Sequence, residues 1–214
     1  MGVKIKKFTF NGFQENTYVV YNEQSCVIID PGCYDREEQK TLTEFIQSNN
    51  LTPKALLLTH AHIDHVLGCA YVLDTFNVDF YIHKEDIATL SAVPNYSKIY
   101  GFPGYTPPKE PTHLLNGGEK LDFDGITFDV FFTPGHCVGH VVYYNKEQDF
   151  VINGDVLFAG SFGRTDLPGG DMKVLKKSIF EIMFKLPEQT VVYCGHGGET
   201  TIGEEKRTNY ILQV

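Results

Sequence analysis

Residues 55–65 have the sequence ALLLTHAHIDH, an apolar run that leads directly into three histidines and an aspartate. The apolar residues 55–59 predict a buried strand, and the polar residues lie just beyond its carboxyl end. Open α/β sheets bind ligands beyond the carboxyl ends of their strands, so this position favours a functional site. Three histidines and an acid within six residues are typical of a metal centre, because imidazole and carboxylate ligands suit divalent transition metals.

The spacing of these side chains predicts two metal ions rather than one. His60 and His62 are two residues apart in extended backbone, so they point to the same side and can reach one divalent ion. The chain then turns into a helix, which directs Asp64 and His65 toward a second point. Two ions about 3.5–4 Å apart are the arrangement of many hydrolytic metal centres.

Three further candidate ligands lie in the second half of the chain. Each follows an apolar strand pattern and comes directly after a glycine; they are His136, Asp155 and His196. Together with the first group they make seven candidate ligands. That number suits two ions that share one carboxylate and one water molecule.

The hydrophobic pattern predicts a mixed α/β chain in two similar lobes, about 1–115 and 116–214, within a single domain. Residues 91–113 have no clear period and contain five prolines, so we expect a long ordered loop there. Strands are expected over 3–10, 17–21, 26–30, 55–59, 79–83, 126–132, 141–145, 150–153 and 190–194. Helices are expected from residue 35 to just before Pro53 and over 68–76, 172–186 and 204–212.

Composition excludes several classes of protein. The net charge of −9 opposes nucleic-acid binding, which needs a basic surface to release counterions. No apolar run reaches the roughly 18 residues of a membrane span, and the first residues lack the pattern of a secretory signal. The five cysteines include no C-x-x-C pair, which favours reduced thiols and a cytoplasmic location.

In these motifs the chain resembles the metallo-β-lactamase superfamily over nearly its whole length, and within it the glyoxalase II (hydroxyacylglutathione hydrolase) branch. The resemblance implies an α/β fold, the four-layer αββα sandwich. The stretches similar to glyoxalase II are Gln14-Glu15-Asn16-Thr17-Tyr18, Ile29-Asp30-Pro31-Gly32, Gly154-Asp155-Val156-Leu157-Phe158 and Tyr193-Cys194-Gly195-His196.

The resemblance also implies an activity, a metal-dependent hydrolysis of acyl thioesters by a hydroxide that bridges two divalent ions. Zinc is the expected metal, with iron or manganese as alternatives. The implied ligands are His60, His62 and His136 for one ion, Asp64, His65 and His196 for the other, and Asp155 as the bridge.

Other residues have expected roles around these ligands. Asp64 is the candidate that holds the hydroxide in line with the substrate. Asp30 and His140 are expected to orient ligand side chains. The centre carries a charge of about +1 within an acidic protein, so an anionic thioester is the expected substrate and Arg164 could bind its carboxylate.

The chain departs from glyoxalase II where glutathione would bind. Gly197, Gly198 and Glu199 replace a Glu-Tyr-Thr sequence of that branch, and Asp166 stands where its loop has a tyrosine. The chain also resembles a short form that lacks the C-terminal helical domain. These differences put glutathione specificity in question while the hydrolytic residues are kept.

Two other functions are compatible with these residues. Residues 163–166 are similar to the persulfide dioxygenase branch, which oxidises sulfur at a single iron, and hydrolysis of another ester or a lactone would use the same centre. A non-enzymatic protein that needs its metals only for folding is the third hypothesis. The sequence does not predict the oligomeric state.

Overall fold

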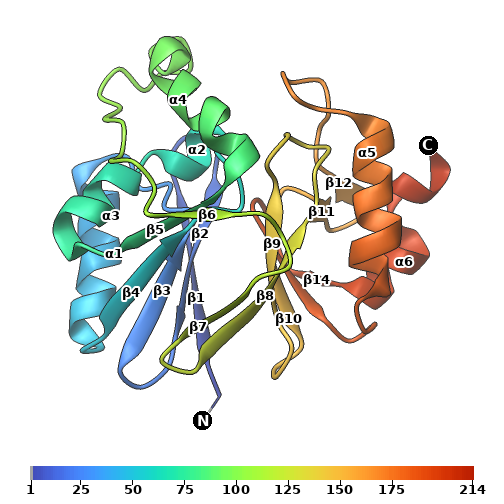
Figure 1. Cartoon of the computed structure of the whole chain (residues 1–214), viewed down its shortest axis with the longest axis horizontal. Coiled ribbons are helices and arrows are strands. Elements are labelled where there is room, and N and C mark those ends of the chain that lie inside the picture. The colour runs from blue at the N-terminus through green and yellow to red at the C-terminus, as the bar shows by residue number, and fades with distance from the viewer. Residues whose placement is uncertain (1) are drawn as a thin grey trace. The chain divides into compact units, whose positions relative to one another are not determined.

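The computed structural model describes residues 2–214, which divide into two compact units (Figure 1). The first unit runs to Leu115 and also includes Asp122–Ile126, whereas the second comprises Asn116–Leu121 and Thr127–Val214. Each unit has all or most of a six-stranded sheet and helices of its own. That the chain forms a single domain stays a prediction.

The first unit contains a mixed six-stranded sheet whose strands follow one another in sequence order, β1 to β6. The first three strands pair antiparallel, and β3 to β6 pair parallel. The carboxyl ends of β3, β4 and β5 therefore lie side by side at one edge. The strands are β1 (Lys4–Phe10), β2 (Glu15–Tyr21), β3 (Ser25–Ile29), β4 (Thr52–Leu57), β5 (Asp79–His83) and β6 (His113–Leu115).

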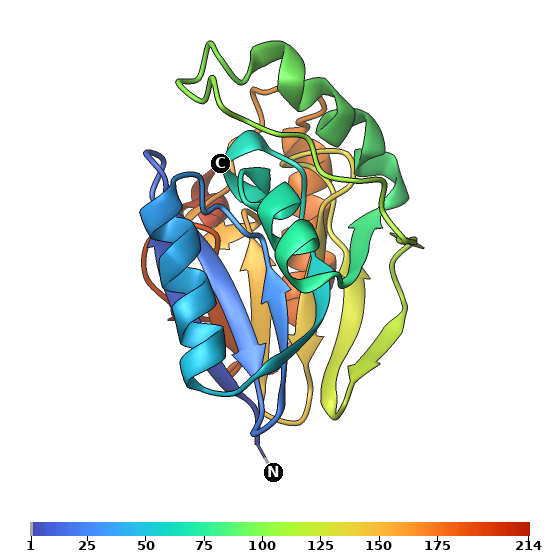
Figure 2. The same cartoon turned by 90° about the vertical axis from the view of Figure 1, so that its left-hand side faces the viewer.

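Helices α1 (Arg36–Ser48) and α3 (Cys69–Phe76) lie beside each other over this sheet (Figure 2). Asp35 begins α1 as a capping box, because its carboxylate accepts the N–H groups of the first turn and Glu38 reaches back to it. Apolar residues of both helices and of the sheet form one core cluster. The short helix α2 (Ile63–Val66) precedes α3.

A short 3₁₀ turn, η1 (Lys84–Asp86), leads into helix α4 (Ile87–Tyr96). The expectation of an irregular segment over residues 91–113 is therefore wrong for residues 91–96, and also where β6 begins. Leu90 and Val93 are buried and anchor the helix. Pro94 lies inside α4, near its carboxyl end.

The second unit contains most of a six-stranded sheet with the order β14-β13-β10-β9-β8-β7; the last residues of β7 and the first of β8 belong to the first unit. β10 pairs antiparallel with β9 and parallel with β13, so this sheet is also mixed. A small hairpin, β11 (Leu157–Phe158) and β12 (Ser161–Phe162), follows β10. The sheet strands are β7 (Lys120–Phe123), β8 (Ile126–Phe132), β9 (Val141–Asn145), β10 (Phe150–Gly154), β13 (Val191–Cys194) and β14 (Thr200–Thr201).

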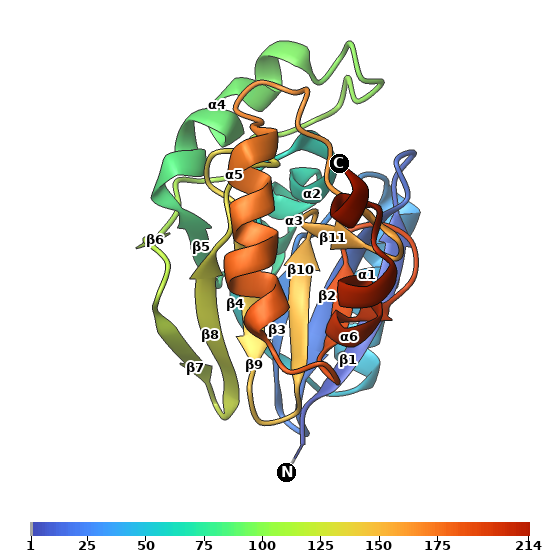
Figure 3. The ribbon, with the colours of Figure 1, turned by 90° about the vertical axis from the view of Figure 1, so that its right-hand side faces the viewer.

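The helix expected over residues 172–186 is present but changes type along its length. It begins as α5 (Met172–Lys177), continues as a π segment, η2 (Ser178–Ile182), and ends as a 3₁₀ turn, η3 (Met183–Lys185). Figure 3 shows it lying along one face of the sheet. Helix α6 (Ile202–Thr208) and a 3₁₀ turn, η4 (Tyr210–Gln213), complete the unit.

The two mixed sheets and their helices confirm the predicted α/β fold class. Within residues 2–214, no helix combines the length and the apolar character needed to cross a bilayer.

Candidate metal centre

The residues that follow β4 bring four candidate ligands together in the first unit. His62 is extended and α2 begins at the next residue, so the chain bends sharply between the two pairs of ligands. The ring of His60 lies 4.8 Å from that of His62 and 4.1 Å from that of His65, measured between centroids. His60 and His65 are completely buried, whereas His62 and Asp64 are partly exposed.

Asp30 and Thr59 fix the proton of the His60 imidazole. The Thr59 hydroxyl donates to Asp30 Oδ2 at 2.5 Å, so its oxygen can accept from His60 Nδ1, which lies 3.0 Å away. The Thr59 N–H also donates to Asp30 Oδ1 at 2.7 Å. With its proton on Nδ1, the His60 ring has a lone pair on Nε2, which is the form that binds a metal.

Asp30 also fixes the proton of the His65 imidazole, in this case by direct contact. Asp30 Oδ2 lies 3.2 Å from His65 Nδ1, which places the imidazole proton on that nitrogen. His65 Nε2 lies 3.7 Å from Asp64 Oδ2. The structure therefore puts Asp30 behind two candidate ligands, where the sequence predicted contact with one.

The sequence reasoning did not single out Glu15, which is completely buried on β2. Its Oε1 lies 3.8 Å from His65 Nδ1, and the Thr17 hydroxyl donates to its Oε2 at 2.9 Å. Burial raises the pKa of this carboxyl well above its usual value. A glutamate within a strand whose residues are nearly all buried, two positions before the expected strand over 17–21, was the signal that could have identified it.

The second unit brings His136, Asp155 and His196 together. Asp155 Oδ2 lies 3.6 Å from His136 Nε2 and 3.6 Å from His196 Nε2. His136 Nδ1 lies 2.8 Å from the main-chain oxygen of Arg164, a pure acceptor, so His136 also carries its proton on Nδ1.

His140 supports Asp155 through the backbone. The Asp155 N–H donates to His140 Nε2 at 3.1 Å, so that nitrogen carries no proton. The proton lies on His140 Nδ1, which faces the Thr133 hydroxyl at 3.2 Å. This contact places His140 behind the candidate bridging ligand. Its effect on metal binding stays a prediction.

The Arg164 side chain forms an ion pair with the neighbouring Asp166. Its guanidinium donates two hydrogen bonds of 2.7 Å to the Asp166 carboxylate, and both side chains are exposed. This contact lowers the pKa of Asp166 to about 2. The sequence suggested a role for the Arg164 side chain but could not show that its main-chain oxygen contacts His136.

The donor atoms of each unit fit a divalent metal ion. His65 Nε2 and Asp64 Oδ2 both carry lone pairs, and so do His136 Nε2 and Asp155 Oδ2, so neither pair can share a hydrogen bond. Two ligands bound at 2.0–2.2 Å to one tetrahedral ion lie about 3.4 Å apart. The observed separations of 3.6 and 3.7 Å are close to that distance.

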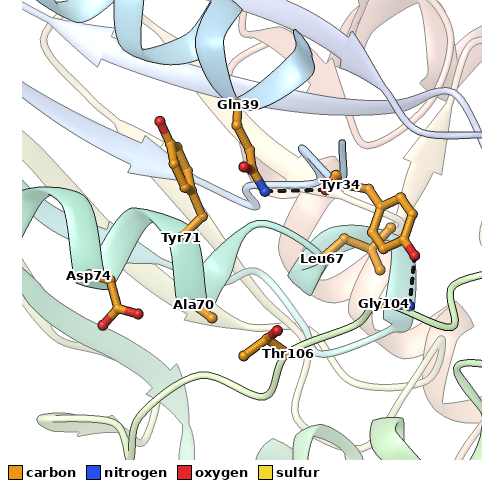
Figure 4. A pocket seen from close by; sticks show the side chains of 8 residues that line it. All are labelled: Tyr34, Gln39, Leu67, Ala70, Tyr71, Asp74, Gly104 and Thr106. Carbon is orange, nitrogen blue, oxygen red and sulfur yellow. Dashed lines mark hydrogen bonds between the residues drawn. The ribbon is translucent and has the colours of Figure 1, made fainter. Parts of the chain in front are cut away.

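Figure 4 shows a different site, a cavity of about 190 Å³ in the first unit. Tyr34, Tyr71, Asp74 and Thr106 are among its lining residues. The Tyr34 hydroxyl accepts the N–H of Gly104 at 2.8 Å at its rim. None of the candidate ligands lines this cavity, so the metal centre is a separate feature.

Gly135 fixes the loop that carries His136. Its φ is +126°, and a Cβ there would lie 2.2 Å from the main-chain nitrogen of Leu175 in α5. We expect Gly135→Ala to destabilise the protein by roughly 2–4 kcal/mol, from backbone strain and the clash together. Urea unfolding measures this loss. Gly118→Ala is the matched control, because φ there is +100° but nothing lies within 4 Å; an equal loss in both variants would exclude the clash.

The α/β fold of this chain, with histidine and aspartate clusters beyond its strand ends, is typical of metal-binding α/β proteins. The family model of the metallo-beta-lactamase superfamily matches residues 10–196. The chain belongs to the metallo-β-lactamase superfamily.

Two curated relatives match the chain over 98% of its length and 98% of their own. The probable metallo-hydrolase YqgX of Bacillus subtilis is 36% identical to it. The hydroxyacylglutathione hydrolase GloC of Haemophilus influenzae is 34% identical.

Two crystal structures share the fold. The BLEG-1 B3 metallo-beta-lactamase is 40% identical, with a TM-score of 0.90, and the match covers 99% of this chain and 100% of that one. TTHA1623 in a di-iron-bound form is 38% identical, with a TM-score of 0.84, and the match covers 96% and 98%. Family membership and these relatives support a metal-dependent hydrolase.

Proposed function

We propose that this protein hydrolyses acyl thioesters at a centre of two divalent metal ions. The observation that carries the proposal is the position of Asp155 Oδ2, 3.6 Å from a lone-pair nitrogen of His136 and from His196 Nε2. A carboxylate between two imidazoles is suited to bridge metal ions. The similarity to a hydroxyacylglutathione hydrolase supports a thioester as the substrate.

Zinc fits the nitrogen and oxygen donors, and the di-iron form of TTHA1623 makes iron an alternative, as manganese is on chemical grounds. The proposed ligands are His60, His62 and His136 for the first ion, Asp64, His65 and His196 for the second, and Asp155 for both.

The bound ions would lower the pKa of a water molecule toward neutrality and polarise the thioester carbonyl. The protein's residues would supply the geometry. Asp64 would orient the attacking water by accepting one of its protons in a hydrogen bond. Asp30 keeps the His60 and His65 imidazoles in the tautomer that presents Nε2. The leaving thiolate needs no strong general acid, because thiols are acidic enough to leave as anions.

The test is a substrate panel of thioesters, a lactone and glutathione persulfide, run on protein whose metal content has been measured. Two metal ions per chain with thioester turnover support the proposal. One iron per chain, with oxygen uptake on the persulfide, would replace it with the persulfide dioxygenase function. Chelation that lowers the melting temperature of a protein inactive on every substrate would favour metals that serve folding alone.

Arg164 is proposed to bind a substrate carboxylate after releasing Asp166. We expect Arg164→Ala to raise KM for a carboxylate-bearing thioester about tenfold or more, the value of a bidentate charged hydrogen bond. The kcat for a neutral thioester should be unchanged, because the contact with His136 uses the main chain. Asp166→Ala should have the opposite effect on KM. Equal KM values in Arg164→Ala and wild type would remove Arg164 from the substrate site.

A further inference from the structure

Asp86 is a buried aspartate that belongs to none of the ligand sets above. It is completely inaccessible to solvent and stands at the junction of η1 and α4, as the N-cap residue of α4. An N-cap aspartate ordinarily accepts N–H groups from the first turn of its own helix. Asp86 makes no such capping bond. Its carboxylate accepts a main-chain N–H group from outside α4 instead.

The carboxylate reaches the loop that carries the metal-ligand histidines. Asp86 Oδ2 accepts the N–H of Ala61 at 2.5 Å, and Oδ1 accepts the Thr89 hydroxyl at 2.8 Å. Ala61 is the residue between His60 and His62. The bond therefore holds the His60–Ala61 peptide group, which includes the Cα of His60 and is joined to His62 through Ala61.

The strand order explains why an aspartate from this part of the chain reaches that loop. β3, β4 and β5 are parallel neighbours, with β4 in the middle. Asp30 follows β3 and accepts the N–H of Thr59, whereas Asp86 follows β5 and accepts the N–H of Ala61. The loop that leaves β4 is thus held from both sides by carboxylates.

We propose that Asp86 is a positioning residue for the metal centre, which holds the His60–Ala61 peptide so that both histidines present their nitrogens to one ion. This inference rests on the proposed function, in which His60 and His62 bind the same metal. Burying a carboxylate is costly unless hydrogen bonds compensate it, and the Ala61 N–H of the loop and the Thr89 hydroxyl are two donors that do so. In this proposal the effect comes from the hydrogen bond with the Ala61 N–H rather than from the negative charge of Asp86.

Two substitutions separate hydrogen bonding from charge. Asp86→Ala removes the acceptor and should weaken zinc binding about 10–100-fold, the usual effect of losing a partner behind a metal ligand. Asp86→Asn is expected to bind zinc within about threefold of wild type. Its amide oxygen can accept from Ala61, and its NH₂ group can donate to the Thr89 hydroxyl oxygen.

The measurements are zinc affinity by competition with a chelator, the visible spectrum of the Co²⁺-substituted protein, and the melting temperature of the metal-free protein. Asp86→Ala should change the Co²⁺ spectrum, and Asp86→Asn should restore it. Glu205→Ala is the matched control, because Glu205 is a buried carboxylate that accepts the N–H of Gly160. It should lower the melting temperature and leave zinc affinity unchanged.

Wild-type affinity in Asp86→Ala would overturn the positioning role, and so would equal losses in Asp86→Ala and Asp86→Asn, because charge would then be the cause. If Asp86→Ala does not fold, Asp86→Leu replaces it, since leucine has the same branching at Cγ as aspartate but no acceptor. Failure of wild-type protein to bind zinc, cobalt, iron or manganese would overturn the proposed function itself, which is a different result from a failure of Asp86 alone.

Discussion

Asp155→Asn is expected to lower kcat/KM for a thioester by at least about 10³-fold, equivalent to about 4 kcal/mol of transition-state stabilisation. The substitution keeps the shape of the side chain but removes the negative charge that lies between His136 and His196. An amide is a poor bridge between two cations. The variant should therefore bind fewer than two metal ions per chain, as measured by elemental analysis after dialysis.

The same variant separates metal binding from folding. A metal ion that binds only the folded state raises stability, so zinc should raise the melting temperature of the wild-type protein. We expect this increase to be much smaller in Asp155→Asn, although the metal-free proteins melt at similar temperatures. Asp129→Asn is the control, because Asp129 pairs with Lys120 at the surface. Two tightly bound ions and activity within tenfold of wild type would show that Asp155 is no bridge.

The candidate ligands could be found from the sequence because the chemistry of this site is local. Residues 60–65 form a metal-ligand pattern without any knowledge of the fold. The fold class also followed, since the longer strands have apolar runs and the longer helices have an apolar face. Short elements were missed: β6, β11, β12 and β14 have two or three residues each, too few to show a period.

Asp30 and His140 were expected from the sequence to support the candidate ligands, but the other supporting residues could not be found in this way. Asp86 contacts Ala61 from 25 positions away, and Glu15 approaches His65 from 50 positions away. These contacts depend on which strands are neighbours, and a single sequence does not give the strand order. The contact of the Arg164 main-chain oxygen with His136 has no sequence signal at all, because every residue has a carbonyl group.

Asp30→Ala is expected to destabilise the metal-free protein by about 3–5 kcal/mol. Three donors lose their acceptor, namely the Thr59 N–H, the Thr59 hydroxyl and the His65 Nδ1–H. Alanine would also be strained at this position, where φ is +49°. Urea unfolding with metal removed measures the loss. A loss below about 1 kcal/mol would show that this network contributes little to folding.

Asp30→Asn should separate the two roles of this residue. Asparagine tolerates a positive φ, and its amide oxygen can still accept the Thr59 N–H, so we expect a stability loss of only about 1–2 kcal/mol. The NH₂ group would then occupy the place of Oδ2 and face His65 Nδ1. That nitrogen would have to accept, which moves the imidazole proton to Nε2, the nitrogen proposed to bind the metal.

The exchange of donor and acceptor should continue from residue 30 through the Thr59 hydroxyl to the His60 imidazole. A hydroxyl that accepts from the new amide group can donate to His60 Nδ1, which moves the proton of this ring to Nε2 as well. Both histidines would present an N–H group to the cation, so zinc affinity should fall about 100-fold or more despite the small change in stability. Asp86→Asn carries the same chemical change beside the same loop but leaves both tautomers intact. Equal zinc affinities in Asp30→Asn and Asp86→Asn would therefore contradict control of the tautomers by Asp30.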